Sequence, residues 1–257
     1  MNKLKWSLTR KALLAIVIIF LPVIITFGLV YKHNREYLKE RFLDILTVIA
    51  DAYEGHVYQF LEMSKRRVQD FASDGFIRSQ LQKRIHGRVF STDTLSKHLI
   101  KNKIVLDKTI KNICVLSLEG QVVASTNTSE IGKDYSREPF YIKGKASVTV
   151  VESPVMPCGL PGLEISAPIL TKDTGMPIGV IVNFILISEL DKLLSGEYDK
   201  ELGVISWGKG KVAWKTLEIY LVNRDSRMIT KSMFVKDAVL KQVVTTLPVE
   251  EALTSNK

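Results

Sequence analysis

The sequence predicts an α+β protein in which an N-terminal transmembrane helix continues into a long helix and is followed by antiparallel strands. Three observations predict this architecture. An apolar run occupies residues 12–31, apolar side chains then recur at helical spacing to about residue 82, and short apolar strands alternate with turns from residue 112 onward. We therefore expect one membrane-anchored chain that carries a sheet-containing domain.

The apolar run at residues 12–31 is long enough to cross a bilayer, which takes about 20 residues in a helix. It is longer than the apolar core of a signal peptide, about 7 to 15 residues, and no small-residue cleavage site follows it. The basic residues before it favour a cytoplasmic N-terminus; they are Lys3, Lys5, Arg10 and Lys11. We expect a single-pass protein of the inner (plasma) membrane whose C-terminal region is extracytoplasmic.

The charge of the chain argues against a nucleic-acid partner. The net charge is +9, but the basic residues are scattered along the chain and are not gathered with aromatic side chains on one element. Lipid headgroups of the bilayer are a better partner for Lys32 and Arg35. The chain has two cysteines, Cys114 and Cys158, which either form a disulfide or are a buried strand residue and a free loop thiol.

Residues 32–82 read as a long helix that leaves the membrane. Apolar side chains step along it by three and four residues and form one stripe, which comprises Leu38, Phe42, Ile45, Ile49, Ala52 and His56. The stripe packs either on its own domain or on a second copy of the chain, and we expect a homodimer through this helix. Asp74 and Gly75 mark a bend, and Ser91 or Thr92 caps a further helix over about residues 93–110.

A hairpin follows, with its turn at Glu119 and Gly120. Strand alternation places Cys114 and Leu116 on one face and Ile113 on the other. Serine, threonine and asparagine at residues 125–129 then end the second strand.

The next loop is rich in aromatic and charged residues and is the candidate binding site. Tyr135, Arg137, Phe140 and Tyr141 lie close together in it, and Pro139 restricts the backbone. A guanidinium binds a carboxylate through a planar fork, and aromatic rings supply apolar walls and partners for cations. The alternative is a surface loop whose aromatic rings pack on the sheet beneath.

Three more strands are predicted, at residues 147–152, 164–170 and 178–187. The last is apolar on both faces apart from Asn183, which must find a hydrogen-bond partner. That partner is either a ligand or a backbone group, and Asn183 therefore joins the candidate ligand-binding residues.

The C-terminal part alternates short elements with loops. Ser188 is expected to cap a short helix that Gly196 closes, and residues 201–216 form an exposed loop anchored by Trp207 and Trp214. Two strands are expected to pair around residues 223–226, and residues 235–244 are read as helical. The GKGK sequence in the exposed loop lacks the spacing of a phosphate-binding loop.

Six segments, in this order and spacing, carry a family resemblance: DFASDGFIRS (70–79), ICVLSLEGQVVAST (113–126), IGKDYSREPFY (131–141), LEISAPIL (163–170), GMPIGVIVNFILISEL (175–190) and IYLVNRDSRMIT (219–230). The chain resembles the extracytoplasmic double Cache sensor domains, which are tandem PAS-like modules of bacterial chemoreceptors, sensor histidine kinases and diguanylate cyclases. The implied organisation is a cytoplasmic N-terminus (1–11), a transmembrane helix (12–31), a stalk helix and bend (32–90), a membrane-distal PAS-like module (91–187), and a connector with an incomplete membrane-proximal PAS-like module (188–257).

The resemblance implies a small organic ligand, of the amino acid, amine or carboxylate class, held between the sheet and the loop at residues 132–141. Two positions depart from the pattern of amino-acid-binding members. Glu138 stands where an arginine precedes the aromatic pair, and Asn183 or Phe184 stands where the last strand has an aspartate. Arg137, one position earlier, is the expected substitute for the arginine.

We therefore expect the sensing region of a membrane-bound bacterial signal-transduction receptor, of the chemotaxis or two-component type, without its output domain. The alternatives are a membrane-anchored structural or dimerisation protein and, less favoured, a membrane-anchored hydrolase. The sequence contains no G-x-S-x-G, H-E-x-x-H or C-x-x-C motif. We accordingly expect no enzyme activity, cofactor or metal in this chain, and any kinase or cyclase activity would belong to an output domain.

Overall fold

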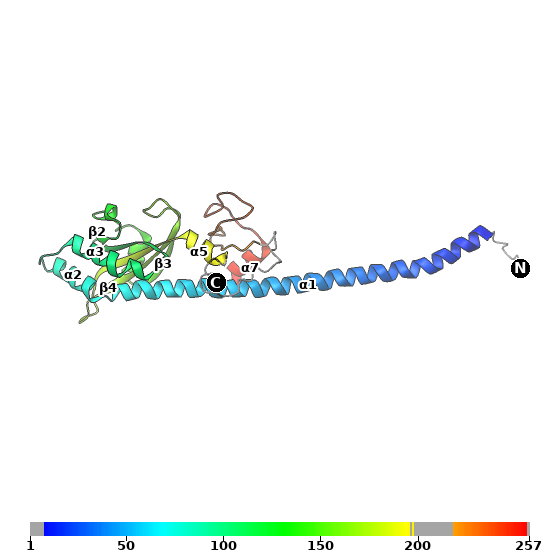
Figure 1. The fold of residues 1–257 in the computed structure, drawn as a ribbon, viewed down its shortest axis with the longest axis horizontal. Coiled ribbons are helices and arrows are strands. Elements are labelled where there is room, and N and C mark those ends of the chain that lie inside the picture. The colour runs from blue at the N-terminus through cyan, green and yellow to red at the C-terminus, as the bar shows by residue number, and fades with distance from the viewer. Residues whose placement is uncertain (1–7, 196, 198–217, 256–257) are drawn as a thin grey trace. The chain divides into compact units, whose positions relative to one another are not determined.

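The computed structural model describes residues 8–195, 197 and 218–255. The chain divides into two compact units, Met1–Glu54 and Gly55–Lys257. The first unit consists, in its described part, of the N-terminal part of α1, a helix that spans Leu8–Ala72 (Figure 1). Its large apolar side chains from Ile16 to Val30 are exposed. This is the single helix in the described part of the chain that is apolar and long enough to cross a membrane.

The second unit contains one sheet, flanking helices and a C-terminal segment. Its helices are α2 (Gly75–Ile85), α3 (Thr92–Asn102), α4 (Pro139–Gly144), α5 (Ile187–Leu194) and α7 (Leu247–Ser255), with 3-10 turns η1 (Ile104–Leu106) and η2 (Thr128–Glu130). Its strands are β1 (Ile110–Leu116), β2 (Val122–Ser125), β3 (Thr149–Ser153), β4 (Gly162–Leu170) and β5 (Pro177–Leu186). The strands form a five-stranded antiparallel sheet in the order β2-β1-β5-β4-β3.

The long helix, predicted to reach about residue 82, ends at Ala72, and the bend predicted at Asp74 and Gly75 separates it from α2. The side chain of Asp74 accepts hydrogen bonds from the backbone N–H groups of Phe76 (2.8 Å) and Ile77 (3.0 Å) and so caps α2. Ser91 caps α3 in the same way, accepting from Thr94 at 3.2 Å. The helix predicted at residues 93–110 is shorter than expected, because α3 ends at Asn102 and the chain passes through η1 into β1.

The predicted hairpin joins β1 to β2. Gly120 adopts a φ of +89°, and a side chain there would lie 2.5 Å from the backbone of Ser136, so both conformation and space require glycine. The hairpin between β4 and β5 is also present, with Gly175 at a φ of +67° in its turn.

The sheet has two differently covered faces. We call the first the helix face, because α1, α2 and α3 cover it; its core contains Val68, Phe71, Leu95, Leu99, Ile113, Val115, Ile165, Ile181 and Ile185. We call the second the α4 face; its core contains Cys114, Leu116, Val180, Val182 and Phe184 together with Phe140, Tyr141 and Met156. The strand predicted to be apolar on both faces, β5, is buried on both faces except at its two ends.

Some local predictions are wrong. The second half of the predicted aromatic loop is helical, since Pro139 occupies the first turn of α4, where its missing N–H is not needed. Leu186, and not Ser188, precedes α5, and no side-chain hydrogen bond caps that helix.

The C-terminal segment differs most from prediction. Residues 235–244 are not helical, because Asp237 and Leu240 have φ values of +53° and +57°, which interrupt a helix. The two strands expected around residues 223–226 are reduced to one bridge between Val222 and Met228. The predicted Trp-anchored loop at 201–216, and Gly196, lie outside the described residues.

Candidate functional site

A pocket of about 300 Å³ opens on the α4 face of the sheet. Its lining comes from the start of β1, the segment after β2, the loop after β3 and the end of β5, and comprises Lys111, Asn112, Thr126, Asn127, Glu130, Met156, Pro157, Cys158 and Phe184. The volume lies at the lower end of the range of small-molecule sites. One side of the pocket is polar and the other is apolar, which suits a small ligand with a polar group and an apolar body.

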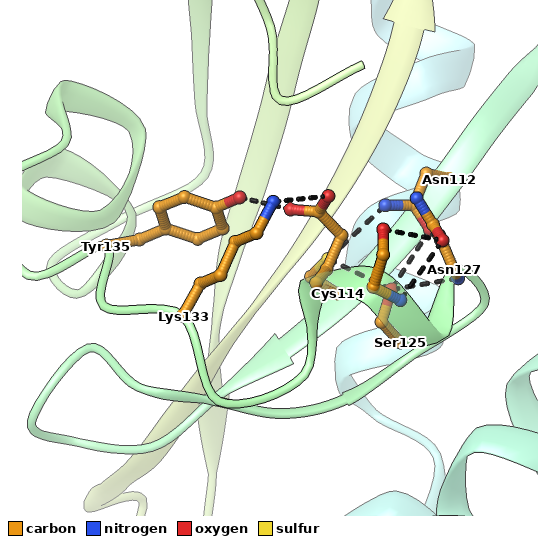
Figure 2. A network of polar contacts seen from close by, with 8 residues as sticks. Asn112, Cys114, Ser125, Asn127, Lys133 and Tyr135 are labelled. Atoms are coloured by element: carbon orange, nitrogen blue, oxygen red, sulfur yellow. Dashed lines mark hydrogen bonds and ion pairs between the residues drawn. The ribbon is translucent and has the colours of Figure 1, made fainter.

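Asn112 organises the polar side. Its Oδ1 accepts hydrogen bonds from Ser125 Oγ (3.1 Å), Thr126 Oγ1 (2.5 Å) and the backbone N–H of Asn127 (3.1 Å). Figure 2 shows Ser125 and Asn127 beside Asn112. The antiparallel pairing of β1 with β2 makes this possible, because Cys114 lies opposite Ser125. Asn112, which precedes Cys114, therefore lies at the same end of the two strands as Thr126 and Asn127, which follow Ser125. The carbonyl of Asn112 is thus saturated with donors and holds the pocket wall in shape.

Glu130 is the buried charge of the pocket, with its residue only 2% exposed. Lys133 Nζ lies 2.9 Å from its Oε1, and the hydroxyl of Tyr135 donates a short hydrogen bond to its Oε2. Figure 2 shows Lys133 and Tyr135 converging on the same carboxylate. Burial and this hydrogen bond to an anion raise the pKa of Tyr135 well above its usual value.

The apolar side of the pocket is the loop between β3 and β4 together with Phe184. Met156 is buried, and its backbone N–H bonds the carbonyl of Leu160 at 2.9 Å, which closes the loop on itself. A side chain on Gly162 would meet Met156 Sδ at 2.3 Å, so the glycine makes room for the methionine. Cys158 lies at the exposed rim of the same loop.

The two cysteines are free, and this decides between the two alternatives of the sequence. Burial raises the pKa of Cys114 to about 12, although the hydrogen bond from its Sγ to Ser125 Oγ (3.2 Å) acts in the opposite direction. The thiol of Cys114 is therefore inert, whereas Cys158 is accessible to reagents.

A second buried carboxyl group, Glu164, lies on the α4 face. It pairs with Phe184 across β4 and β5, and its neighbours Leu163 and Ile165 belong to the helix face. Burial raises the pKa of Glu164 to about 7, with the hydrogen bond from Ser153 opposing and the charge of Glu138 adding to the shift.

None of the five sequence-predicted site residues belongs to the lining of the pocket, and only Tyr135 and Phe140 contact a lining residue. Tyr135 contacts the lining through its bond to Glu130. The ring of Phe140 packs edge-on against Tyr135 (5.6 Å) and against Phe184 (5.7 Å), so it supports the lining from behind. The structure therefore brings these two predicted residues together.

The other three predicted residues lie apart. Tyr141 is buried, and its hydroxyl donates to the backbone carbonyl of Leu118. Arg137 is exposed. Asn183 pairs with Ile113 and Ile165 across the sheet and therefore lies on the helix face, opposite Phe184. Neither polar side-chain atom of Asn183 has a hydrogen-bond partner within the described part of the chain.

Sequence reasoning missed the polar residues that line the pocket, above all Asn112 and Glu130. The serine- and threonine-rich stretch at residues 125–129 was read only as a strand ending. The available signal was an acidic residue, Glu130, placed next to the apolar Ile131 at the end of that polar stretch. Among the described residues no group of three or more histidine, cysteine, aspartate or glutamate side chains is placed to hold a metal ion.

The fold matches solved sensor domains. The sensor domain of the V. cholerae histidine kinase DctB superposes with a TM-score of 0.61 at 14% identity, over 82% of this chain and 74% of that one. The ligand-binding domain of the P. aeruginosa PAO1 amino acid chemoreceptor PctB, in complex with L-Gln, gives 0.53 at 18% identity, over 77% and 71%. That of the P. fluorescens chemoreceptor CtaA, in complex with L-alanine, gives 0.51 at 14% identity, over 77% and 74%. No protein-family model and no curated protein matches the sequence.

These comparisons confirm the predicted resemblance to tandem PAS-like sensor domains at the level of the fold. The α+β class is likewise confirmed, as a long N-terminal helix followed by a five-stranded antiparallel sheet. At these identities the likeness shows the fold alone.

Proposed function

We propose that this chain is the extracytoplasmic small-molecule-sensing region of a bacterial membrane receptor, of the chemotaxis or two-component type. The observation that carries the proposal is the pocket on the α4 face, with its polar wall at Asn112 and Glu130 and its apolar wall at Met156 and Phe184. A concave site of this volume with convergent polar groups is the usual form of a ligand site.

The proposal includes a membrane anchor. The exposed apolar side chains of α1 from Ile16 to Val30 would be costly in water, and a bilayer removes that cost. The basic residues before the run favour a cytoplasmic N-terminus, which puts the pocket outside the inner membrane.

The proposal also includes a homodimer through α1. The predicted apolar stripe beyond the membrane contains Leu38, Phe42 and Ile45, each of which is at least 39% exposed. A second copy of the helix is the partner that a repeat of this spacing fits.

Hydrogen bonds and ion pairs supply a route from the pocket towards the end of α1. Ser125, which donates to Asn112 in the pocket wall, donates its backbone N–H to Ser96 Oγ of α3 at 3.2 Å. Lys103, at the end of α3, pairs with Asp74 at 2.7 Å, and Asp74 lies two residues after the end of α1. A ligand that favours one arrangement of the Asn112 network could thereby bias the position of α3 against α1.

Cys158 provides a direct test, because it lines the pocket and is accessible. The full chain in detergent micelles is treated with a maleimide, with and without a panel of amino acids, amines and carboxylates, and labelling is followed by mass spectrometry. A bound ligand is expected to slow the labelling of Cys158 several-fold, while Cys114 stays unlabelled throughout. A compound that protects should also raise the melting temperature, since it binds only the folded form.

Two outcomes would contradict the proposal. One is that no compound changes either the labelling rate or the melting temperature of the folded chain. The other is that protection survives substitution of the lining residue Phe184 by alanine but is lost on substitution of the exposed Arg137, which would move the site to the aromatic loop. The predicted ligand contacts of Tyr135, Arg137, Phe140, Tyr141 and Asn183 are tested by the same assay.

A further inference from the structure

The charges around the pocket are unequal in their burial. Two charged residues line it, Lys111 and Glu130. Lys111 is exposed to solvent, whereas Glu130 is almost completely buried. A charge in solvent is screened and worth little to a ligand, while a charge in a pocket acts at a lower effective dielectric. Among the lining residues the buried charge is therefore the negative one of Glu130, and its ion-pair partner Lys133 lies outside the lining.

The carboxylate of Glu130 has capacity left for a further donor. An ionised carboxylate offers about four acceptor positions, and two are in use here, by Lys133 and Tyr135. The side chain of Lys133 is 46% exposed, so this internal cation can move into solvent at little cost. An ammonium group in the pocket can share the carboxylate with Lys133 or take its place.

The other acceptor in the polar wall is occupied. Asn112 Oδ1 already accepts three hydrogen bonds, which leaves Glu130 as the buried acceptor with free capacity in the lining. The opposite wall of Met156, Pro157 and Phe184 is apolar, and the face of the Phe184 ring attracts cations. The carboxyl of Glu164 beside Phe184 lies on the same face and adds negative potential when ionised.

We propose that the pocket selects ligands bearing a cationic amine on a short apolar body, with Glu130 as the residue that determines this specificity. The inference rests on the proposed function, because it assigns a chemical class to the ligand of that pocket. This specificity distinguishes amines from simple carboxylates, because the negative charge of Glu130 would repel a carboxylate ligand.

Matched probes of opposite charge test the proposal. The full chain in detergent micelles is titrated with n-butylamine, butyrate and 4-aminobutyrate, and binding is read from the melting temperature and from protection of Cys158. We expect n-butylamine to bind and butyrate not to bind. Glu130→Gln should weaken amine binding by about ten- to a hundredfold, as expected for loss of a hydrogen bond to a charged group. Glu119→Gln, which removes an exposed carboxylate in the hairpin turn, is the matched control and should bind like the parent.

A second variant keeps the test decisive if Glu130→Gln does not fold. Lys133→Met removes the internal cation, so the amine should bind about tenfold more tightly to a carboxylate that has lost its partner. If butyrate binds and n-butylamine does not, or if Lys133→Met leaves the amine affinity unchanged, the amine specificity is wrong while the pocket remains a ligand site. If none of the probes and none of the wider panel binds, both the specificity and the proposed function are wrong.

Discussion

Replacing Asn183 by leucine is expected to stabilise the protein. Asn183 is 1% exposed, and neither its Oδ1 nor its Nδ2 has a hydrogen-bond partner within the described residues. An unpaired buried polar group costs about 1–3 kcal/mol, and leucine has the same branched shape without that cost. The neighbours of Asn183 across the sheet are the apolar Ile113 and Ile165, which suit a leucine. We expect a gain of about 2 kcal/mol, or a melting temperature higher by about 4–8 °C in a domain of this size.

Asn112→Leu is the matched control, because the Oδ1 of this second buried asparagine accepts three hydrogen bonds. Its loss leaves Ser125, Thr126 and the Asn127 N–H without their acceptor, so the melting temperature should fall, by an amount that corresponds to about 2–4 kcal/mol. Both variants are measured by circular dichroism on the full chain in the same detergent. A loss of stability in Asn183→Leu comparable with that in Asn112→Leu would refute the reasoning, since it would mean that the amide of Asn183 is paired.

Three further predictions concern stability. Burial raises the pKa of Glu164 to about 7 from 4.5, so the contribution of its protonated form to folding stability is fully present below pH 4.5 and is lost as the pH rises through 7. The melting temperature of Glu164→Gln relative to that of the parent should therefore be higher at pH 8 than at pH 5. Equal differences at both pH values would contradict this. Asp74→Ala removes the cap of α2 and the partner of Lys103, and should lower the free energy of unfolding by about 2–4 kcal/mol in urea titrations, whereas an unchanged midpoint would show that the cap is dispensable. Gly120→Ala should cost more than about 1 kcal/mol, and clearly more than Gly87→Ala, because a Cβ meets backbone atoms at 2.5 Å at the first position and nothing within 4 Å at the second; similar losses would contradict this.

Features that depend on neighbouring residues could be predicted from the sequence. The bend at Asp74, the cap at Ser91 and the turn at Gly120 each follow from the chemistry of one or two residues, and all three are present. Local patterns failed where tertiary contacts outweigh them. At residues 235–244 a helical pattern gives way to turns in which Ala238 and Val244 pack with Met228 in a small separate core.

The candidate site could be predicted only in part. Two residues of the aromatic loop contact the lining of the pocket, because Tyr135 donates a hydrogen bond to Glu130 and the ring of Phe140 packs on Phe184, while their predicted contact with a ligand stays a prediction. Asn183 was assigned to the ligand because a polar residue in an apolar strand needs a partner. The strand order then decided that its side chain lies under the helices, on the face opposite the pocket.

The sequence by itself determined the apolar run of the N-terminal helix, the succession of strands and turns, and which residues share a face of each strand, because these depend on spacings of two to four residues. Only the tertiary structure decided where the pocket lies. Its wall brings together Asn112, Glu130 and Cys158, which are far apart along the chain. Their meeting depends on the pairing of β1 with β2 and β5 and on the loop after β3, and no local pattern records which strands become neighbours.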